Sequence, residues 1–179
     1  MIYKLDPLTV NAYSRPGKPL TAVRAIVLHW TMAPGQDIKQ TRQYWEDRFD
    51  GNNGFGGAHM LIDGERVLET IPLNEMAYHV GAERYTEFAV RYIGSYPNAY
   101  TIGIELAHED WLGKPSDATW DTTVQILRDL TKRFNVTPHM IVTHFDVTGL
   151  RPQWRGLPCH RWFVEQPGEL ARLRADVLA

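Results

Sequence analysis

Short apolar runs alternate with longer amphipathic stretches along this chain. The run 25–28 (AIVL) is continuously apolar and rich in β-branched residues, which is typical of a strand buried on both faces. Two further runs flank the turn pair Asp63 and Gly64, a pattern that predicts a β-hairpin. The expected strands cover residues 25–28, 59–62, 66–70, 101–106 and 140–143.

Three stretches repeat apolar residues at helical spacing and cover residues 37–49, 117–134 and 167–178. Ser116 is a suitable N-cap for the second stretch, and Pro167 suits the first position of the third. The first stretch should pack on the sheet through Ile38, Thr41, Tyr44, Trp45 and Arg48.

Segments 1–22 and 50–57 are rich in Pro, Gly or Asn, and they predict irregular structure with room for one short strand in the first. The order of strands and helices predicts an α/β fold with a central mixed β-sheet flanked by helices. A length of 179 residues with 44% hydrophobic content suits one well-buried core. We therefore expect residues 1–179 to form a single domain.

Charge and hydropathy exclude several classes of partner. Nineteen basic and twenty-one acidic residues give a formal charge of -2, which offers no electrostatic footprint for nucleic acid or an anionic membrane. No run approaches the roughly 20 apolar residues of a membrane span, and the N-terminal segment lacks the apolar core of a signal peptide. We expect a protein made in the cytoplasm that binds neither nucleic acid nor membrane, and we favour a monomer.

Three residues that could bind a soft metal lie far apart in the sequence. His29 follows the apolar run AIVL and His144 follows MIVT, so adjacent strands would present both rings at the same edge of the sheet. Cys159 is the only cysteine, which rules out an internal disulfide and leaves a buried apolar filler, a nucleophile or a metal ligand. Two imidazoles and one thiolate leave the fourth position of a tetrahedral zinc ion open for water, which is the arrangement of a catalytic zinc site.

Two other interpretations compete with the zinc site. Cys159 could act as a nucleophile with its neighbour His160, but adjacent residues in extended structure point apart and nothing nearby resembles a nucleophile elbow. The histidines could also be structural, in which case the protein would hold no stoichiometric zinc. The matched settings of His29 and His144 favour the metal.

Glu105 is the strongest candidate acid or base. It lies in the predicted strand 101–106 among apolar neighbours, where burial should raise its pKa and suit it to proton transfer. The alternative is a structural carboxylate paired with Arg24 or Arg91.

Five sequence blocks together resemble the zinc-dependent N-acetylmuramoyl-L-alanine amidases, a family that includes phage endolysin domains, cytoplasmic anhydromuropeptide amidases and peptidoglycan recognition proteins. The blocks are IVLHWT (26–31), GGAHMLID (56–63), PLNEMAYHVG (72–81), TIGIELA (101–107) and VTHFDVTG (142–149). The resemblance covers roughly residues 22–165, with the blocks in family order. It implies a mixed sheet flanked by helices and hydrolysis of the amide between N-acetylmuramic acid and L-alanine in bacterial peptidoglycan.

The resemblance also implies residue roles. His29, His144 and Cys159 resemble the zinc ligands, and Glu105 resembles the general base that activates water. Residues expected along the substrate groove or next to the reacting group are Trp30, Thr31, His59, Asn74, His79 and Arg155. The alternative within the same fold is a recognition module that binds peptidoglycan without cleaving it, and the presence of both Cys159 and Glu105 argues against it.

The sequence departs from the family pattern at three points. Ala58 stands where many members have a tyrosine that contacts the reacting carbonyl, so Glu105 carries more weight here. Leu157 stands where many have a lysine that is proposed to stabilise the oxyanion, so Arg155, His160 or the zinc itself would have to do so. The segment 148–159 is also long, which leaves Asp146 as a weaker alternative for the third ligand. The cellular role could be lysis from within by a phage or prophage enzyme, or recycling of cytoplasmic muropeptides.

Overall fold

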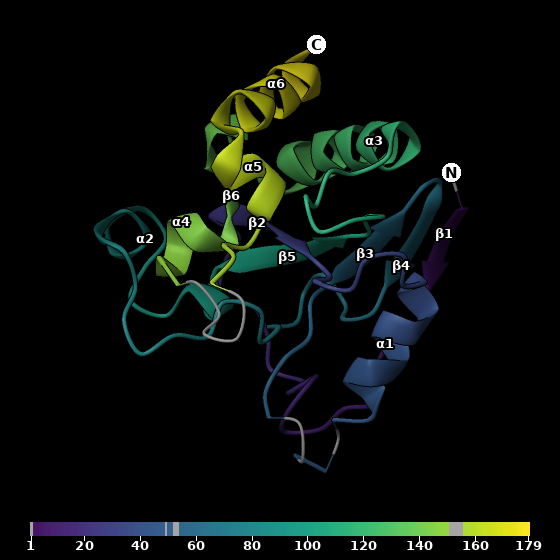
Figure 1. Ribbon diagram of the computed structural model, residues 1–179. Helices are drawn as coiled ribbons and strands as arrows, with labels where there is room; N and C mark the ends of the chain where they lie inside the picture. The colour runs from purple at the N-terminus through teal and green to yellow at the C-terminus, as the bar shows by residue number, and fades with distance from the viewer. Residues whose placement is uncertain (1, 49, 52–53, 151–155) are drawn as a thin grey trace.

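The computed structural model describes residues 2–48, 50–51, 54–150 and 156–179. Its centre is a six-stranded mixed sheet with the strand order β1-β4-β3-β5-β2-β6 (Figure 1). The strands are β1 (Ile2–Leu5), β2 (Ala25–Trp30), β3 (Met60–Asp63), β4 (Arg66–Glu69), β5 (Thr101–Leu106) and β6 (Ile141–Thr143). β3 and β4 form an antiparallel hairpin, whereas β3, β5, β2 and β6 run parallel to one another.

The central position of β2 follows from its composition. All six of its residues are buried, as expected for a parallel strand that is covered on both faces. It pairs with β5 on one side and β6 on the other, and the register places His29 opposite Glu105. The carboxyl ends of these three parallel strands therefore meet at one edge of the sheet.

One face of the sheet is covered by helices α3 (Asp117–Phe134), α5 (Arg161–Glu165) and α6 (Pro167–Leu178), which lie above the sheet in Figure 1. Side chains at alternate positions of the central strands pack against them, including Leu28 and Ile104 beneath Leu127 and Leu173. Ser116 caps α3 by accepting a hydrogen bond from the amide of Thr119. This is the largest hydrophobic core of the described residues.

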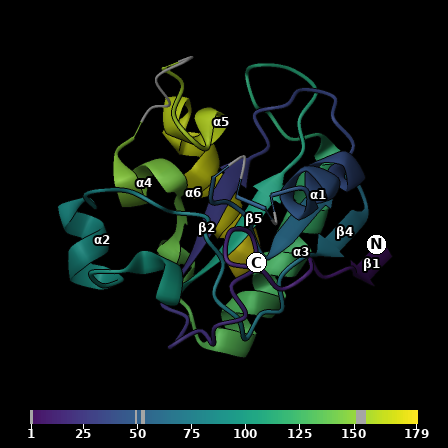
Figure 2. The same cartoon turned by 90° about the horizontal axis from the view of Figure 1, so that it is seen from below.

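In the described part of the chain, helices cover the opposite face only at its two sides (Figures 1 and 2). Helix α1 (Ile38–Glu46) packs over β3 and β4 with its own small core around Trp45. Helices α2 (Glu87–Tyr92) and α4 (His144–Thr148) cover the side of β2 and β6 with another small core around Val147. Two separately packed walls thus flank the central strands on this face.

Most of the predicted elements are confirmed. The predicted strand 101–106 and the predicted helices 117–134 and 167–178 have the observed bounds, and the N-terminal segment contains one short strand. The strand predicted at 25–28 continues through Trp30, because His29 and Trp30 also pair with β5. No helix in the described part of the chain has the length and apolarity that crossing a membrane requires.

The sequence prediction differs from the structure at several short elements. The first helix, predicted to reach residue 49, ends at Glu46, and of its expected apolar face Tyr44 is exposed. Helices α2, α4 and α5 were not predicted, because each has only five or six residues and too little sequence to show a helical period. Met140, expected in a strand, belongs to a short 3₁₀ turn that precedes β6.

Candidate metal centre and active site

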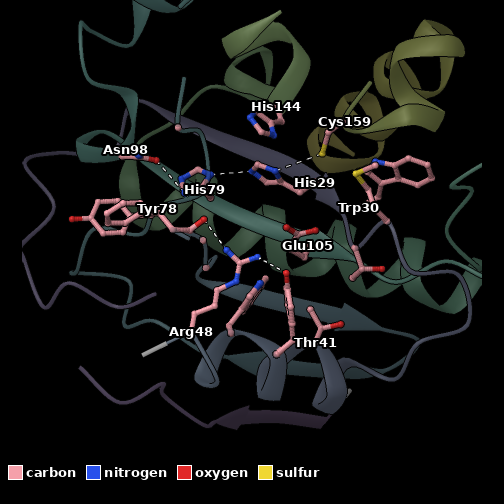
Figure 3. Close-up of a pocket in the computed structure, with 18 of the residues that line it drawn as sticks. His29, Trp30, Thr41, Arg48, Tyr78, His79, Asn98, Glu105, His144 and Cys159 are labelled. Carbon is pink, nitrogen blue, oxygen red and sulfur yellow. Dashed lines mark hydrogen bonds between the residues drawn. The ribbon is translucent and has the colours of Figure 1, made fainter. Parts of the chain in front are cut away.

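The three predicted metal ligands meet at the carboxyl edge of the parallel strands. His29 is near the end of β2, His144 begins α4 directly after β6, and Cys159 precedes α5. One ligand atom from each lies within 4.8 Å of the others, and Cys159 Sγ is 3.6 Å from His29 Nδ1 (Figure 3). The amide of Phe145 donates to the carbonyl of Cys159, which ties the segment that carries the thiol to the residue after His144.

A capping box positions His144. The hydroxyl of Thr143 accepts a hydrogen bond from the amide of Asp146, and the Asp146 carboxylate accepts one from the amide of Thr143 at 2.8 Å. These bonds fix the turn from β6 into α4, so that His144 is the first helical residue. They also occupy the Asp146 carboxylate, which is not in the ligand cluster. The structure therefore gives no support to Asp146 as the third ligand.

The donor atoms of this cluster fit a metal ion. His144 Nε2 is buried without a hydrogen-bond partner, which is costly unless another group binds it. Burial, with the neighbouring histidines, holds the pKa of His29 well below its usual value, and burial lowers that of His144 to about 4. Both rings are therefore neutral near pH 7 and present lone pairs. Burial raises the pKa of the Cys159 thiol, and a bound cation would reverse this shift by favouring the thiolate.

Glu105 lies beside the cluster. It is the only residue of β5 that is not fully buried, and it is the register partner of His29. Its Oε2 atom is buried without a partner, and burial raises its pKa to about 8. A carboxyl group held in this state can donate a proton, and it can accept one when a neighbouring positive charge lowers its pKa.

The structural alternative for Glu105 is wrong. The guanidinium of Arg24 donates to the carbonyl of Ile93 and lies over the ring of Tyr100. Arg91 lies over the ring of Tyr92. Glu105 has no ion pair with either arginine, nor with any other residue that the structure describes.

The cluster opens into a cavity of about 1130 Å³ between the two walls of the open face. The three candidate ligands, Glu105, Trp30, Thr31 and His79 line its floor or sides, and so do Tyr44, Phe55, Tyr78, Tyr85 and Tyr96. Arg48 and Glu105 are its only formally charged residues in the described part of the chain. Within the described residues, the lining thus offers aromatic faces and hydrogen-bonding groups more than charge.

Comparison with known proteins identifies the family. Residues 19–156 match the family described as N-acetylmuramoyl-L-alanine amidase. The chain belongs to this family.

Curated relatives of the amidase chain come from bacilli. It is 30% identical over 168 residues to a probable N-acetylmuramoyl-L-alanine amidase of Bacillus licheniformis, covering 94% of this chain and 45% of that protein. It is 32% identical over 148 residues to the N-acetylmuramoyl-L-alanine amidase BlyA of Bacillus subtilis (strain 168), covering 79% and 39%. The chain thus spans less than half the length of these relatives.

Solved structures share the amidase fold. The catalytic domain of XlyA superposes with a TM-score of 0.72 at 20% identity, covering 99% of both chains. PlyL gives a TM-score of 0.69 at 18% identity, covering 99% of this chain and 96% of its own. The Staphylococcus aureus hydrolase AmiA, solved in complex with its ligand, gives 0.64 at 17% identity, covering 99% and 84%. The predicted α/β architecture is confirmed.

Two residues expected along the substrate groove of the amidase lie elsewhere. His59 is fully buried, accepts the amide of Gly103 on Nδ1 and bonds the Glu75 carbonyl through Nε2, so it has a structural place below the cavity. Asn74 lies on an exposed turn away from the cavity lining. Arg155 lies outside the described residues.

Ala58, where the sequence departs from the family pattern, and His160, suggested as an oxyanion donor, are both buried outside the cavity lining. Ala58 is fully buried and accepts a hydrogen bond from the hydroxyl of Thr70 through its carbonyl. His160, offered as an oxyanion donor or as a partner for a nucleophilic thiol, is fully buried with its ring centroid 4.5 Å from that of Phe163. It does not line the cavity, and the thiol of Cys159 faces His29 instead.

Asn98 is a site residue that sequence reasoning missed. It is buried and lines the cavity, and its Oδ1 accepts the amides of His79 and Val80 at 3.1 and 3.0 Å. The segment around it has no periodicity, and its partners are eighteen and nineteen residues away, so the sequence carried no local signal for this role.

The pKa of Glu105 predicts a pH effect on the metal-free protein. Between pH about 4.5 and 8 the folded protein keeps a proton on Glu105 that the unfolded chain releases. Because the folded state then binds more protons, this carboxyl lowers the free energy of unfolding as pH rises through that window. Glu105→Gln stays neutral throughout. We expect its stability relative to wild type to increase by at least about 1 kcal/mol from pH 5 to 8, the equivalent of roughly one pKa unit.

Urea denaturation in the presence of a chelator, at several pH values, measures this difference. The histidines titrate in both proteins, so their contribution cancels in the comparison. A stability difference that does not change with pH would mean that Glu105 ionises normally in the folded state.

Proposed function

We propose that this chain is the catalytic domain of a zinc-dependent amidase that hydrolyses the bond between N-acetylmuramic acid and L-alanine in bacterial peptidoglycan. The observation that carries the proposal is the convergence of His29, His144 and Cys159 next to Glu105 on the floor of one cavity. The family membership of the chain and the printed names of its relatives support the substrate. We treat residues 1–179 as one domain, because all six strands belong to a single sheet.

Zinc is the metal that this donor set favours. Two imidazole nitrogens and one thiolate are typical ligands of zinc, and three protein ligands leave one position for water or substrate. When bound, zinc supplies Lewis acidity, which acidifies a water molecule and polarises a carbonyl oxygen. Before the ion binds, both histidines are neutral with free lone pairs, and burial keeps the Cys159 thiol protonated.

Glu105 performs the proton transfers in the proposed reaction. With a cation nearby its carboxyl group ionises, and it then accepts the proton that water releases on attacking the scissile carbonyl. It returns that proton to the nitrogen of L-alanine as the C–N bond breaks, so that a free amine leaves and a carboxylate remains on the muramic acid. The partly open position of Glu105 in the cavity lets both groups reach it.

The cavity fits the proposed substrate. Its volume slightly exceeds the ~300–1,000 Å³ of pockets for drug-sized ligands, which suits a sugar with part of a peptide stem. Aromatic side chains such as Tyr78, Tyr85 and Tyr96 offer faces on which a sugar ring can stack. A recognition module without catalysis would need the same groove but neither Cys159 nor Glu105, so the presence of both favours hydrolysis.

Digestion of purified peptidoglycan tests the proposal. The zinc-loaded protein should release peptides with a free L-alanine amino terminus, detected by mass spectrometry, and chelation should abolish the release. Uncut muropeptides in the presence of bound zinc would overturn the assignment and favour a binding module.

Glu105→Gln should separate chemistry from binding. The amide keeps the size of the side chain but cannot accept the proton, so we expect turnover to fall by about 10²–10⁴-fold. Zinc content, measured by elemental analysis, and the circular dichroism spectrum should match those of wild type. Near-normal turnover would remove Glu105 from the mechanism.

Cys159→Ser should weaken zinc binding, because a serine hydroxyl is a far poorer ligand than a thiolate. Zinc occupancy after dialysis against a mild chelator measures the effect. Asp146→Asn is the matched control, since it retains an oxygen for the cap of α4 and should hold zinc as wild type does. Full occupancy in the serine variant, or loss of zinc in the Asp146 variant, would contradict the proposed ligand set.

A further inference from the structure

A line of hydrogen bonds runs from a backbone carbonyl to the candidate ligand His29. The hydroxyl of Thr101 donates to the carbonyl of Pro97 at 2.9 Å. The same hydroxyl oxygen lies 2.9 Å from Nε2 of His79. His79 Nδ1 lies 2.9 Å from Nε2 of His29, and Figure 3 shows this bond. The other nitrogen of His29, Nδ1, faces the sulfur of Cys159.

The carbonyl fixes the direction of every bond in this line. A carbonyl oxygen can only accept, so the single hydroxyl proton of Thr101 must point at Pro97. The hydroxyl can then only accept from His79, which places the proton of His79 on Nε2. His79 Nδ1 is therefore an acceptor, and it takes the proton of His29 Nε2. His29 Nδ1 is left with a lone pair directed at the ligand cluster.

We propose that His79 is a positioning residue that selects the tautomer and orientation of His29 for metal binding, with Thr101 and the Pro97 carbonyl setting the polarity. The proposal rests on the metal site proposed above. It gives His79 a different role from the substrate contact implied by the family resemblance. Metal-bound histidines are commonly held through their second nitrogen, and loss of such a partner weakens metal binding by about 10–100-fold.

The surroundings of His79 are built to hold its ring in this place. Gly103 of β5 faces the ring, and a Cβ atom there would lie 2.6 Å from His79 Cγ and Nδ1. The backbone amide of His79 donates a hydrogen bond to Oδ1 of Asn98, which holds the backbone of His79 in place. The rings of His79 and His29 meet edge to face, with centroids 5.1 Å apart. His79, Thr101 and His29 are all buried, so water does not compete for their hydrogen bonds.

Nitrogen chemical shifts of the metal-free protein test the tautomer directly. Long-range ¹H–¹⁵N correlation spectra at neutral pH distinguish protonated from unprotonated ring nitrogens. We expect the wild-type protein to show His29 and His79 each protonated on Nε2 only. A His29 ring protonated on Nδ1 would overturn the proposal.

Two matched variants of Thr101 test whether its hydroxyl sets the tautomer of His29 through His79. Thr101→Val keeps the shape of the side chain but removes the hydroxyl, so the tautomer of His79 is no longer fixed and the Nδ1-protonated form of His29 should become populated. Thr101→Ser keeps the hydroxyl and should retain the wild-type spectrum. The zinc dissociation constant, measured by competition with a chromophoric chelator, should rise for valine and not for serine.

Two variants of His79 test the importance of its Nδ1 acceptor for zinc affinity. His79→Phe keeps a planar ring without an acceptor, and we expect the zinc dissociation constant to rise about 10–100-fold. His79→Asn places an amide oxygen near the position of Nδ1 and should restore part of the affinity. Circular dichroism confirms that each variant is folded before zinc is added.

The outcomes separate the two proposals. In one outcome the wild-type protein binds zinc and hydrolyses peptidoglycan, but Thr101→Val and Thr101→Ser have the same zinc affinity and the same His29 spectrum. That outcome overturns the positioning role of His79 and leaves the proposed function intact. If the wild-type protein binds no zinc, both fall together.

Discussion

The structure depends on the parallel pairing of three strands. β2 lies between β5 and β6, and this alignment brings the carboxyl ends of all three to one edge of the sheet. His29, Glu105 and His144 stand at or just beyond those ends, although 76 and 39 residues separate them along the chain. The thiol of Cys159 joins them because the Phe145 amide binds its carbonyl. The large core beneath β2 and β5 holds this alignment in place.

Burial gives the site its chemical state. Desolvation alone keeps the His144 imidazole neutral and raises the pKa of the Glu105 carboxyl to about 8, and both side chains have a polar atom without a partner. Such atoms lower the stability of a folded protein unless a ligand satisfies them. The free energy of binding a cation here therefore includes the relief of this unsatisfied polarity, which links metal binding to folding stability.

The sequence predicted the parts of the structure that depend on local patterns. The long helix 117–134 has an N-cap and enough turns to show its apolar face. The strand 101–106 is recognisable because its apolar residues alternate around a glycine. The ligand set could be predicted because His29 and His144 each end an apolar strand. The places of His59, His79 and Asn98 could not, because each depends on hydrogen bonds to segments at least sixteen residues away. A residue next to a motif can point into the core as readily as into the site.

The two walls of the cavity have cores of their own, one around Trp45 under α1 and one around Val147 under α2 and α4. The core under α1 contains no residue of β2, β5, β6 or α4, the elements that carry the two candidate histidine ligands and Glu105. The core under α2 and α4, by contrast, includes Val27 of β2 and Val147 of α4, so this wall shares its packing with the elements that carry His29 and His144. A change in the α1 wall can therefore alter the shape of the cavity without moving a candidate ligand. One side of this fold is thus free to vary in evolution, while the other is constrained by the candidate metal site.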